Sequence, residues 1–227
     1  TKELEDIFDK PTGIYIDYAN VRPWSTKLGW HIDPKRLKQF LDSFTNIKSI
    51  KIYNGTLTGD KKSEELSNSL DKLGYELITK PVKIMRKSID VSSIPSDSTI
   101  ILKDFIRKSL LQQLKVETIE YLNSRLREIN EQGIKYVEDW KCNFDVEMSL
   151  DMLIAHREKK IENFIIWSGD SDFESPIMKL LQDNKKVYIF ATARKVSREL
   201  SDLTVDGLTI FEINKIRNFI CWKREIN

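Results

Sequence analysis

The sequence predicts an α/β fold of three layers, in which a mainly parallel central sheet lies between helices. The main observation is an alternation near both ends of the chain: short runs rich in β-branched and aromatic residues are separated by segments of helical periodicity. The helical segments are long enough to connect parallel strands. The 227 residues are enough for one sizeable core, or for one domain with a large insertion.

The amino-terminal part of the chain predicts strands and helices in alternation. Extended runs lie at 13–21, 47–55 and 75–85, and helical segments lie at 33–44 and 58–74. Asp33 is the expected N-cap of the first helix, because Pro34 fits the first helical position. Gly74 is expected to close the second helix.

The same alternation returns near the carboxyl terminus. Strands are expected at 163–167, 186–190 and 208–213, and helices at 174–184 and 194–203. The segment 88–132 is different, because a polar stretch is followed by a long helical pattern. We therefore expect one domain over 12–213, with a helical insertion at about 88–132 and a carboxyl-terminal tail at 214–227. The insertion either packs on the sheet or forms a lid or a subunit contact, and in the last case the protein is a homo-oligomer.

Composition narrows the class of protein. The chain is 40% hydrophobic and 32% charged, as expected of a soluble globular protein. Its 37 Lys and Arg against 35 Asp and Glu give no bulk positive field, so binding of nucleic acid would need local basic patches. Cys142 and Cys221 lack metal-site spacing. There is no apolar run of about 18 residues, so we expect no membrane segment and a cytoplasmic location.

Acidic side chains follow two of the predicted strands. Asp17 ends the first run, and Asp170 and Asp172 follow the run 163–167. Ligands of open parallel sheets bind at the carboxyl ends of the strands, so these carboxylates are expected to meet there. Their mutual repulsion calls for a cation, and a hard divalent ion, Mg²⁺ or Mn²⁺, suits an all-oxygen set.

A further acid is expected at the start of a helix near residue 145. This helix places Val146, Leu150, Leu153 and Ile154 on one stripe, with Asp145 beside the stripe in the first turn. Asp151 lies about 240° around the helix from Asp145, so both cannot face one metal site. We prefer Asp145 as the ligand and expect a structural hydrogen bond or ion pair from Asp151.

Each of these acids also has a structural interpretation. Asp172 could be the N-cap of the following helix. Asp145 could interact only with the helix dipole. Asp17 and Asn20 could form an Asx turn. The metal hypothesis therefore depends on the three acidic elements occurring together.

The stretches "YIDYANV", "KCNFDVEMSLDM" and "WSGDSDFESPI" resemble, in this order, the motifs of NYN domains, the LabA-like branch of the PIN-like nuclease superfamily. The matching positions are Asp17 with Asn20, Lys141 with Asp145, and the hexapeptide 168–173. Ser197, Leu200 and Asp206 are similar to the closing element of the family. The resemblance covers 12–87 and 134–213. One departure is Asn143-Phe144, where the family usually has Gly-Val.

The resemblance implies a PIN-like, Rossmannoid α/β/α fold and a Mg²⁺- or Mn²⁺-dependent ribonuclease that hydrolyses RNA with activated water. It assigns the metal to Asp17, Asp145 and Asp170, with Asp172 as a further ligand. Asn20 would orient a water or the scissile phosphate. Ser168, Ser171 or the backbone amides of 169–171 would touch the phosphate, since they lie at the start of the next helix.

Contacts to single-stranded RNA are expected from basic and aromatic side chains. The basic candidates are Lys80, Lys83, Arg86, Lys87, Lys141 and Arg194. Trp24 could stack on an unpaired base, although loop tryptophans are more often buried. The basic candidates could equally form an ordinary solvated face.

Other functions compete with a ribonuclease. The main alternative is a weakly active or inactive module for RNA binding or assembly. A haloacid-dehalogenase-like phosphatase needs a second Asp two residues after its nucleophile, where this chain has Ala19. A dinucleotide-binding fold needs a Gly-rich turn after its first strand, and the stretch "DYANVRP" has none.

Overall fold

The computed structural model describes residues 2–158, 160–192 and 195–222 and divides the chain into two compact units. The first unit joins residues Thr1–Pro81 to Cys142–Asn227, and the second is Val82–Lys141. The second unit therefore contains the segment 88–132 that was expected as an insertion. No helix within the described residues is long and apolar enough to span a membrane.

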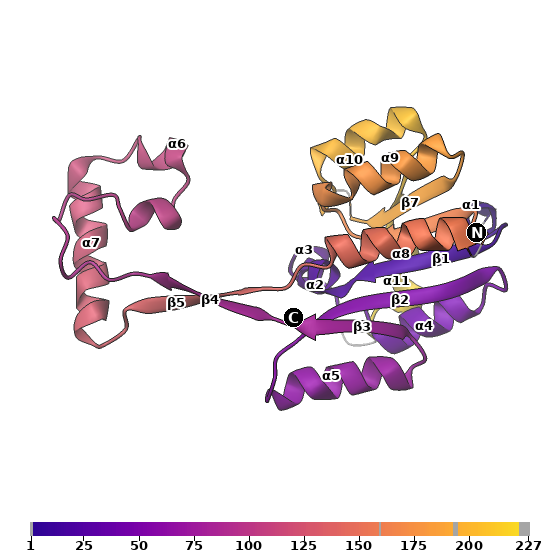
Figure 1. The fold of residues 1–227 in the computed structure, drawn as a ribbon, viewed down its shortest axis with the longest axis horizontal. Coiled ribbons are helices and arrows are strands. Elements are labelled where there is room, and N and C mark those ends of the chain that lie inside the picture. Colours follow the sequence, from indigo (N-terminus) through magenta and orange to yellow (C-terminus); the bar gives the residue numbers. More distant parts are fainter. Residues whose placement is uncertain (1, 159, 193–194, 223–227) are drawn as a thin grey trace. The chain divides into compact units, whose positions relative to one another are not determined.

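The first unit is built on a six-stranded sheet of order β3-β2-β1-β6-β7-β8, in which every neighbouring pair is parallel (Figure 1). The strands are β1 (Thr12–Asp17), β2 (Ile47–Thr56), β3 (Glu76–Pro81), β6 (Asn163–Trp167), β7 (Lys186–Ala191) and β8 (Thr209–Glu212). The predicted α/β fold with a parallel central sheet is confirmed.

Helices cover both faces of this sheet. Figure 1 shows α4 (Pro34–Asp42) and α5 (Lys61–Lys72) on one side and α8 (Asp145–Glu158), α9 (Glu174–Gln182) and α10 (Arg198–Asp202) on the other. This division follows from topology. The chain moves outward from β1 to β3 in one direction and from β6 to β8 in the other, and right-handed crossovers then place the two sets of helices on opposite faces.

Local chemistry sets where these helices begin. Asp33 accepts hydrogen bonds from the backbone N–H groups of Lys35 and Arg36, and Pro34 is the first helical residue of α4. Asp60 caps α5 through the Ser63 N–H at 2.7 Å. The expected cap of α4 is confirmed.

The core includes residues outside the span 12–213. The short helices α1 (Lys2–Ile7) and α11 (Arg217–Ile220) bring Leu4, Ile7 and Ile220 into the main apolar cluster. Central strand residues such as Ile14 and Ile165 are fully buried. Strands that are buried on both faces explain why their sequences are continuously apolar.

The extended run 75–85 is two strands rather than one. β3 ends at Pro81, and β4 (Lys83–Ser88) instead pairs antiparallel with β5 (Tyr136–Lys141) in the second unit. Pro81 has no N–H to donate, so it suits the last position of a strand. The alternation of residues in sequence did not show this change of partner.

The second unit places its helices between β4 and β5. Its longest helix is α7 (Val116–Glu131), with the short elements η2 (Leu102–Asp104) and α6 (Lys108–Leu111) before it. Four of its apolar side chains are buried, and they are Ile89, Val91, Leu102 and Ile119. None of them belongs to the main apolar cluster of the first unit.

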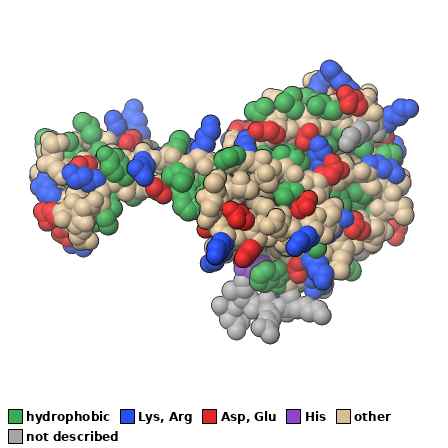
Figure 2. Space-filling view, turned by 60° about the horizontal axis from the view of Figure 1, so that its bottom comes forward, with side chains coloured by type: hydrophobic (Ala, Val, Ile, Leu, Met, Phe, Trp, Pro, Cys, Tyr) green, Lys and Arg blue, Asp and Glu red, His purple; other side chains and the backbone are tan. Residues whose placement is uncertain are grey.

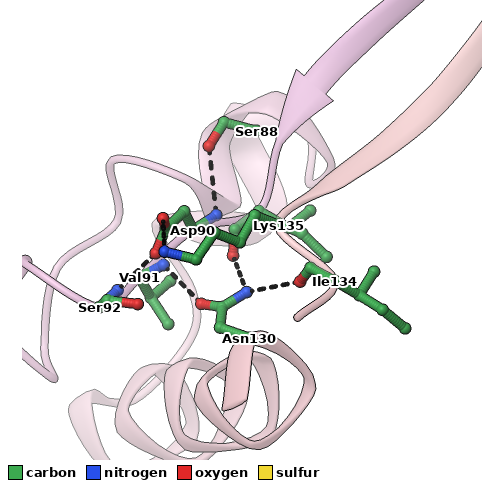
Figure 3. A network of polar contacts seen from close by, with 8 residues as sticks. Ser88, Asp90, Val91, Ser92, Asn130, Ile134 and Lys135 are labelled. Atoms are coloured by element: carbon green, nitrogen blue, oxygen red, sulfur yellow. Dashed lines mark hydrogen bonds and ion pairs between the residues drawn. The ribbon is translucent and has the colours of Figure 1, made fainter. Parts of the chain in front are cut away.

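A polar network lies just beyond the end of the β4–β5 ribbon at which Ser88 pairs with Tyr136 (Figure 3). The buried Asn130 accepts the Val91 N–H at 2.8 Å and donates to the carbonyls of Ile89 and Ile134 at 3.1 and 3.0 Å. Asp90 pairs with Lys135 at 2.9 Å. One side chain thus satisfies three backbone groups, and this compensates for the small apolar core of the unit.

We expect Asn130→Ala to loosen the second unit selectively. The substitution leaves three backbone groups without their partner, at a cost of about 2–4 kcal/mol. Hydrogen exchange should show faster exchange of the Val91 amide, with unchanged protection of β1 and β6. Ser124→Ala, on an exposed position of the same helix, is the control. Unchanged exchange at Val91 in the Asn130 variant would contradict the role of this network.

Candidate functional site

The site begins where β1 and β6 lie side by side. Their register pairs Ile16 with Trp167, so Asp17 and Ser168 follow at the same level. From this point the chain leaves β1 toward one edge of the sheet and β6 toward the other. Such a reversal opens a crevice at the carboxyl ends of the strands, which is where ligands of this class of fold bind.

Asp17 is the last residue of β1 and the N-cap of the short helix α2 (Tyr18–Val21). Its Oδ1 accepts the Asn20 N–H at 3.1 Å, so the Asx turn considered for this pair is present. The side chain is only 7% exposed. Burial is the main cause that raises the pKa of Asp17 to about 6, and the charge of Asp170 adds to it, while the hydrogen bond from Asn20 opposes it.

Asn20 connects this strand end to the packing of the next turn. Its Oδ1 accepts the indole N–H of Trp24 at 3.2 Å. Trp24 is 1% exposed, and Trp30 is 3% exposed and donates to Asn214. This burial agrees with the more common role of a loop tryptophan and does not fit the stacking role considered for Trp24.

The second strand end forms a tight polar turn. Ser168 is fully buried, and its hydroxyl accepts the Asp170 N–H at 3.3 Å. Asp170 in turn accepts the Asp172 N–H at 3.3 Å and caps η3 (Ser171–Phe173), which leads into α9. Asp170 thus caps the turn that leads into α9, whereas Asp172 does not cap α9, whose N-cap is Phe173 without a side-chain hydrogen bond. A phosphate contact predicted for Ser168 does not fit its burial, whereas Ser171 is half-buried.

Gly169 is required in this turn by close approach of another segment. A Cβ at this position would overlap the backbone carbonyl of Lys195. The Gly169 carbonyl also accepts the Ser197 N–H at 2.9 Å. The turn after β6 is therefore held against the segment that precedes α10, and only glycine leaves room for this contact.

Asp145 enters the site as the first residue of α8. Its N–H donates to Asn143 Oδ1 at 2.8 Å. Its own Oδ2 is buried and accepts no hydrogen bond from the described residues. Burial is the main cause that raises the pKa of Asp145 to about 6; the carboxyl groups of Asp172 and Asp170 raise it further, and Asn143 opposes them.

Three carboxylates converge in this region. One oxygen from each of Asp145, Asp170 and Asp172 lies within 4.8 Å of the others. Asp17 is outside this trio, so the grouping differs from the one expected, in which Asp17, Asp145 and Asp170 were the principal ligands. The reason is that η3 lies against the start of α8 and carries Asp172 to Asp145.

The four acids of the site make no ion pairs with the described side chains. Buried carboxylates without a counter-charge are costly, and the raised pKa values of Asp17 and Asp145 express that cost. Asp145 Oδ2, which is buried and unpartnered, is the atom that most needs a positive partner. An oxygen-only set of this kind fits a hard divalent cation.

Asp151 has the kind of structural contacts that were expected for it. Its carboxylate accepts the Tyr53 hydroxyl at 2.6 Å and pairs with Lys51 at 2.9 Å. These partners lie on β2. The carboxylate therefore anchors α8 to the sheet.

The basic residues predicted to bind RNA do not form one cluster. Lys80 belongs to the first unit, where its Nζ pairs with Glu147 at 2.7 Å and lies 4.7 Å from the centre of the Phe144 ring. In the second unit, ion pairs join Arg86 to Glu138 and Lys87 to Asp139. Lys83 faces Lys141 across the ribbon. Arg194 lies outside the described residues. Figure 2 likewise shows basic and acidic side chains interspersed over the visible face.

Sequence reasoning missed two contacts that shape the site. Asn143 holds the start of α8, and the signal for it was an Asn shortly before a predicted helix start. Lys80 and Phe144 form a cation–π contact beside that start, which joins the end of β3 to α8. No sequence pattern indicated this second contact.

Comparisons with known proteins agree with this site. The family model described as NYN domain matches residues 11–94 and 102–206, which includes all four acids and α7 of the second unit. Low amplitude and bright protein LabA of Synechococcus elongatus is 24% identical over 208 residues, covering 91% of this chain and 86% of LabA.

A solved structure shows a similar fold. The crystal structure of a protein of unknown function from Vibrio parahaemolyticus has a TM-score of 0.55 and 17% sequence identity. The match covers 93% of this chain and 95% of that chain. At this identity the likeness concerns the fold alone.

Gly169→Ala should destabilise the fold by roughly 2–3 kcal/mol, because the added Cβ meets backbone that cannot move independently. Gly59→Ala is the matched control: its added Cβ meets nothing within 4 Å, and its positive φ costs about 1 kcal/mol. Thermal unfolding of both variants measures the difference. Equal losses would contradict a close approach at Gly169.

Asp170→Asn should stabilise the cation-free protein at neutral pH. The amide still caps η3, while the repulsion on Asp17 and Asp145 falls, so in EDTA at pH 8 the Tm should rise by about 2–4 °C. Both groups have raised pKa values of about 6, so their destabilising charge is nearly complete at pH 8 and is lost as pH falls through 6. The gain should therefore shrink at pH 5. Asp71→Asn, at an exposed position of α5, should show neither effect.

Proposed function

The chain belongs to the NYN domain family of PIN-like nucleases, and from this premise we propose that it hydrolyses RNA with Mg²⁺ or Mn²⁺ bound at its acidic cluster. The observation that carries the proposal is the Asp145 carboxylate, whose buried Oδ2 has no partner and lies beside two further carboxylates. If these carboxylates only capped helices, they would not need to lie together at the carboxyl ends of the strands, where ligands bind.

Asp145, Asp170 and Asp172 would hold the cation, with Asp17 as a fourth carboxylate beside them. When bound, the cation would lower the pKa of a water molecule and neutralise charge that develops on the phosphate. The capping bond and the Asn143 contact hold Asp170 and Asp145 in place before any ligand binds. The residues present therefore fit such an ion.

Asn20 would contact the substrate through its NH₂ group. Its Oδ1 is already engaged by Trp24, so the free donors of the amide are the ones that can reach a phosphate oxygen. This favours the phosphate role over the water-orienting role considered from the sequence. Ser171 is the hydroxyl of the turn that remains available for a similar contact.

RNA would reach the site as a single strand whose phosphates contact scattered lysines rather than one basic patch. Lys83 and Lys141 are the candidates in the second unit, since the described residues offer them no ion-pair partner. The free thiols of Cys142 and Cys221 support a cytoplasmic location.

Self-association through the second unit also remains a proposal. One face of the ribbon exposes Ile84, Tyr136 and Trp140, which alternate along β4 and β5. A two-stranded ribbon is marginally stable unless something covers it. Substitution of these side chains would test whether the second unit forms a contact between two copies.

The proposed activity can be tested on labelled single-stranded RNA. Cleavage should require Mn²⁺ or Mg²⁺, stop in EDTA, and fall at least about 100-fold in Asp145→Asn and Asp170→Asn. Mn²⁺ should raise the Tm of the wild-type chain and of Asp71→Asn, but not of Asp145→Asn. This shift should weaken below pH 6, because protons then compete for Asp17 and Asp145.

Two outcomes would redirect the proposal. Cleavage that survives EDTA and both substitutions would overturn a metal-dependent nuclease. Salt-sensitive RNA binding without cleavage, together with no Mn²⁺ shift of the Tm, would instead support a module that binds RNA without cutting it.

A further inference from the structure

Helix α8 is apolar on two opposite faces. Its inner face, formed by Met148, Met152 and Ala155, is buried against the sheet. On the outer face Val146, Leu150 and Ile154 are 69%, 54% and 47% exposed. These three residues follow each other at four-residue steps and so form one ridge along the helix. The exposed face of α8 thus carries three of the four residues of the apolar stripe seen in the sequence, whereas the fourth, Leu153, is partly buried against the core.

A helix on a protein surface normally carries one apolar stripe and a polar opposite face. In α8 several polar residues instead lie on the two flanks and make contacts inside the unit. Asp151 binds Tyr53 and Lys51 on one flank, and His156 binds Asp183 at 3.0 Å on the other. The ridge (Val146, Leu150 and Ile154) therefore faces outward between these two flanks.

The chemistry of the ridge selects the type of partner. Branched aliphatic side chains offer neither charge nor stacking surface to a nucleic acid, whereas they pack well against another aliphatic helix. The ridge is also self-complementary. If two copies of α8 pack antiparallel with the two Leu150 side chains in contact, Val146 of each copy meets Ile154 of the other.

Charge along the same face supports this arrangement. Arg157 lies three residues after Ile154 and seven after Leu150, so it continues the ridge toward the carboxyl end. It is exposed and forms no ion pair with a described residue. In the antiparallel pair it passes Val146 of the other copy and reaches the amino-terminal end of that α8, where Asp145 begins the acidic cluster.

We propose that a second copy of this chain covers the ridge of α8 in an antiparallel, two-fold dimer, and that each copy delivers Arg157 to the acidic end of the other. The dimer does not depend on nuclease activity. The role of Arg157 does rest on the proposed function: in the dimer its guanidinium would bind the phosphate of RNA lying over the acids of the other copy.

The dimer is tested by sedimentation velocity of the full chain over a wide range of concentration. Leu150→Glu places two carboxylates against each other on the two-fold axis and should weaken association at least about 10-fold. Val205→Glu, at an 88% exposed site of η5 (Leu203–Asp206), is the control and should leave association unchanged. Thermal unfolding verifies that each variant folds.

The antiparallel register is tested by crosslinking in a background with Cys142→Ser and Cys221→Ser. Oxidation should link Leu150→Cys chains to each other. Val146→Cys should link to Ile154→Cys when the two chains are mixed, and much more slowly to itself. A chain that stays monomeric overturns the proposal. So does a dimer that tolerates Leu150→Glu but is lost in Trp140→Ser, because that dimer uses the second unit.

The role of Arg157 is tested by mixing two impaired chains. Arg157→Ala should keep the dimer and lower cleavage. A mixture of Arg157→Ala with Asp170→Asn should regain about a quarter of wild-type activity, since half of the dimers then hold one complete site. Unchanged cleavage by Arg157→Ala, or no recovery on mixing, overturns the contribution in trans. If no form cleaves RNA, the proposed function fails while sedimentation and crosslinking still decide the dimer.

Discussion

The parallel pairing of β1 with β6 is the constraint on which the site depends. Because both strands run the same way, their carboxyl ends meet, and Asp17 and Ser168 come level although about 150 residues separate them in sequence. The chain then diverges toward opposite edges of the sheet. No connection crosses this point, so the polar turn after β6 is free to place Asp170 and Asp172 there.

The carboxylates that the fold brings together lower the stability of the folded state at neutral pH. Asp17 and Asp145 are ionised in a poorly solvated place beside other carboxylates, and burial accounts for most of the rise in each pKa. The fold tolerates this repulsion because local contacts hold each acid: a cap for Asp170, an Asx turn for Asp17 and the Asn143 contact for Asp145. Such local support for an unfavourable charge is typical of a site that binds a cation.

Helix α8 joins the sheet, the site and the outer surface. Its inner face fills the core, and its first residue is one of the clustered acids. On its flanks Asp151 binds β2 and His156 binds Asp183, the residue that follows α9. The same helix exposes the aliphatic ridge on its outer face. A change in what covers that ridge would therefore act on the helix that carries Asp145, so association and the chemistry of the site share one structural element.

The sequence by itself determined the features that depend on local pattern. Strand runs, the Asp33 and Pro34 helix start, and the acids that follow two strands were readable because periodicity and capping involve residues close together in the chain. Tertiary structure alone decided which acids meet, since Asp172 rather than Asp17 joins Asp145 and Asp170. It also decided that Trp24 is buried, that the strand run divides after Pro81, and that the ridge of α8 faces outward. Periodicity defines a stripe on a helix, but only the neighbours of that helix determine which stripe enters the core.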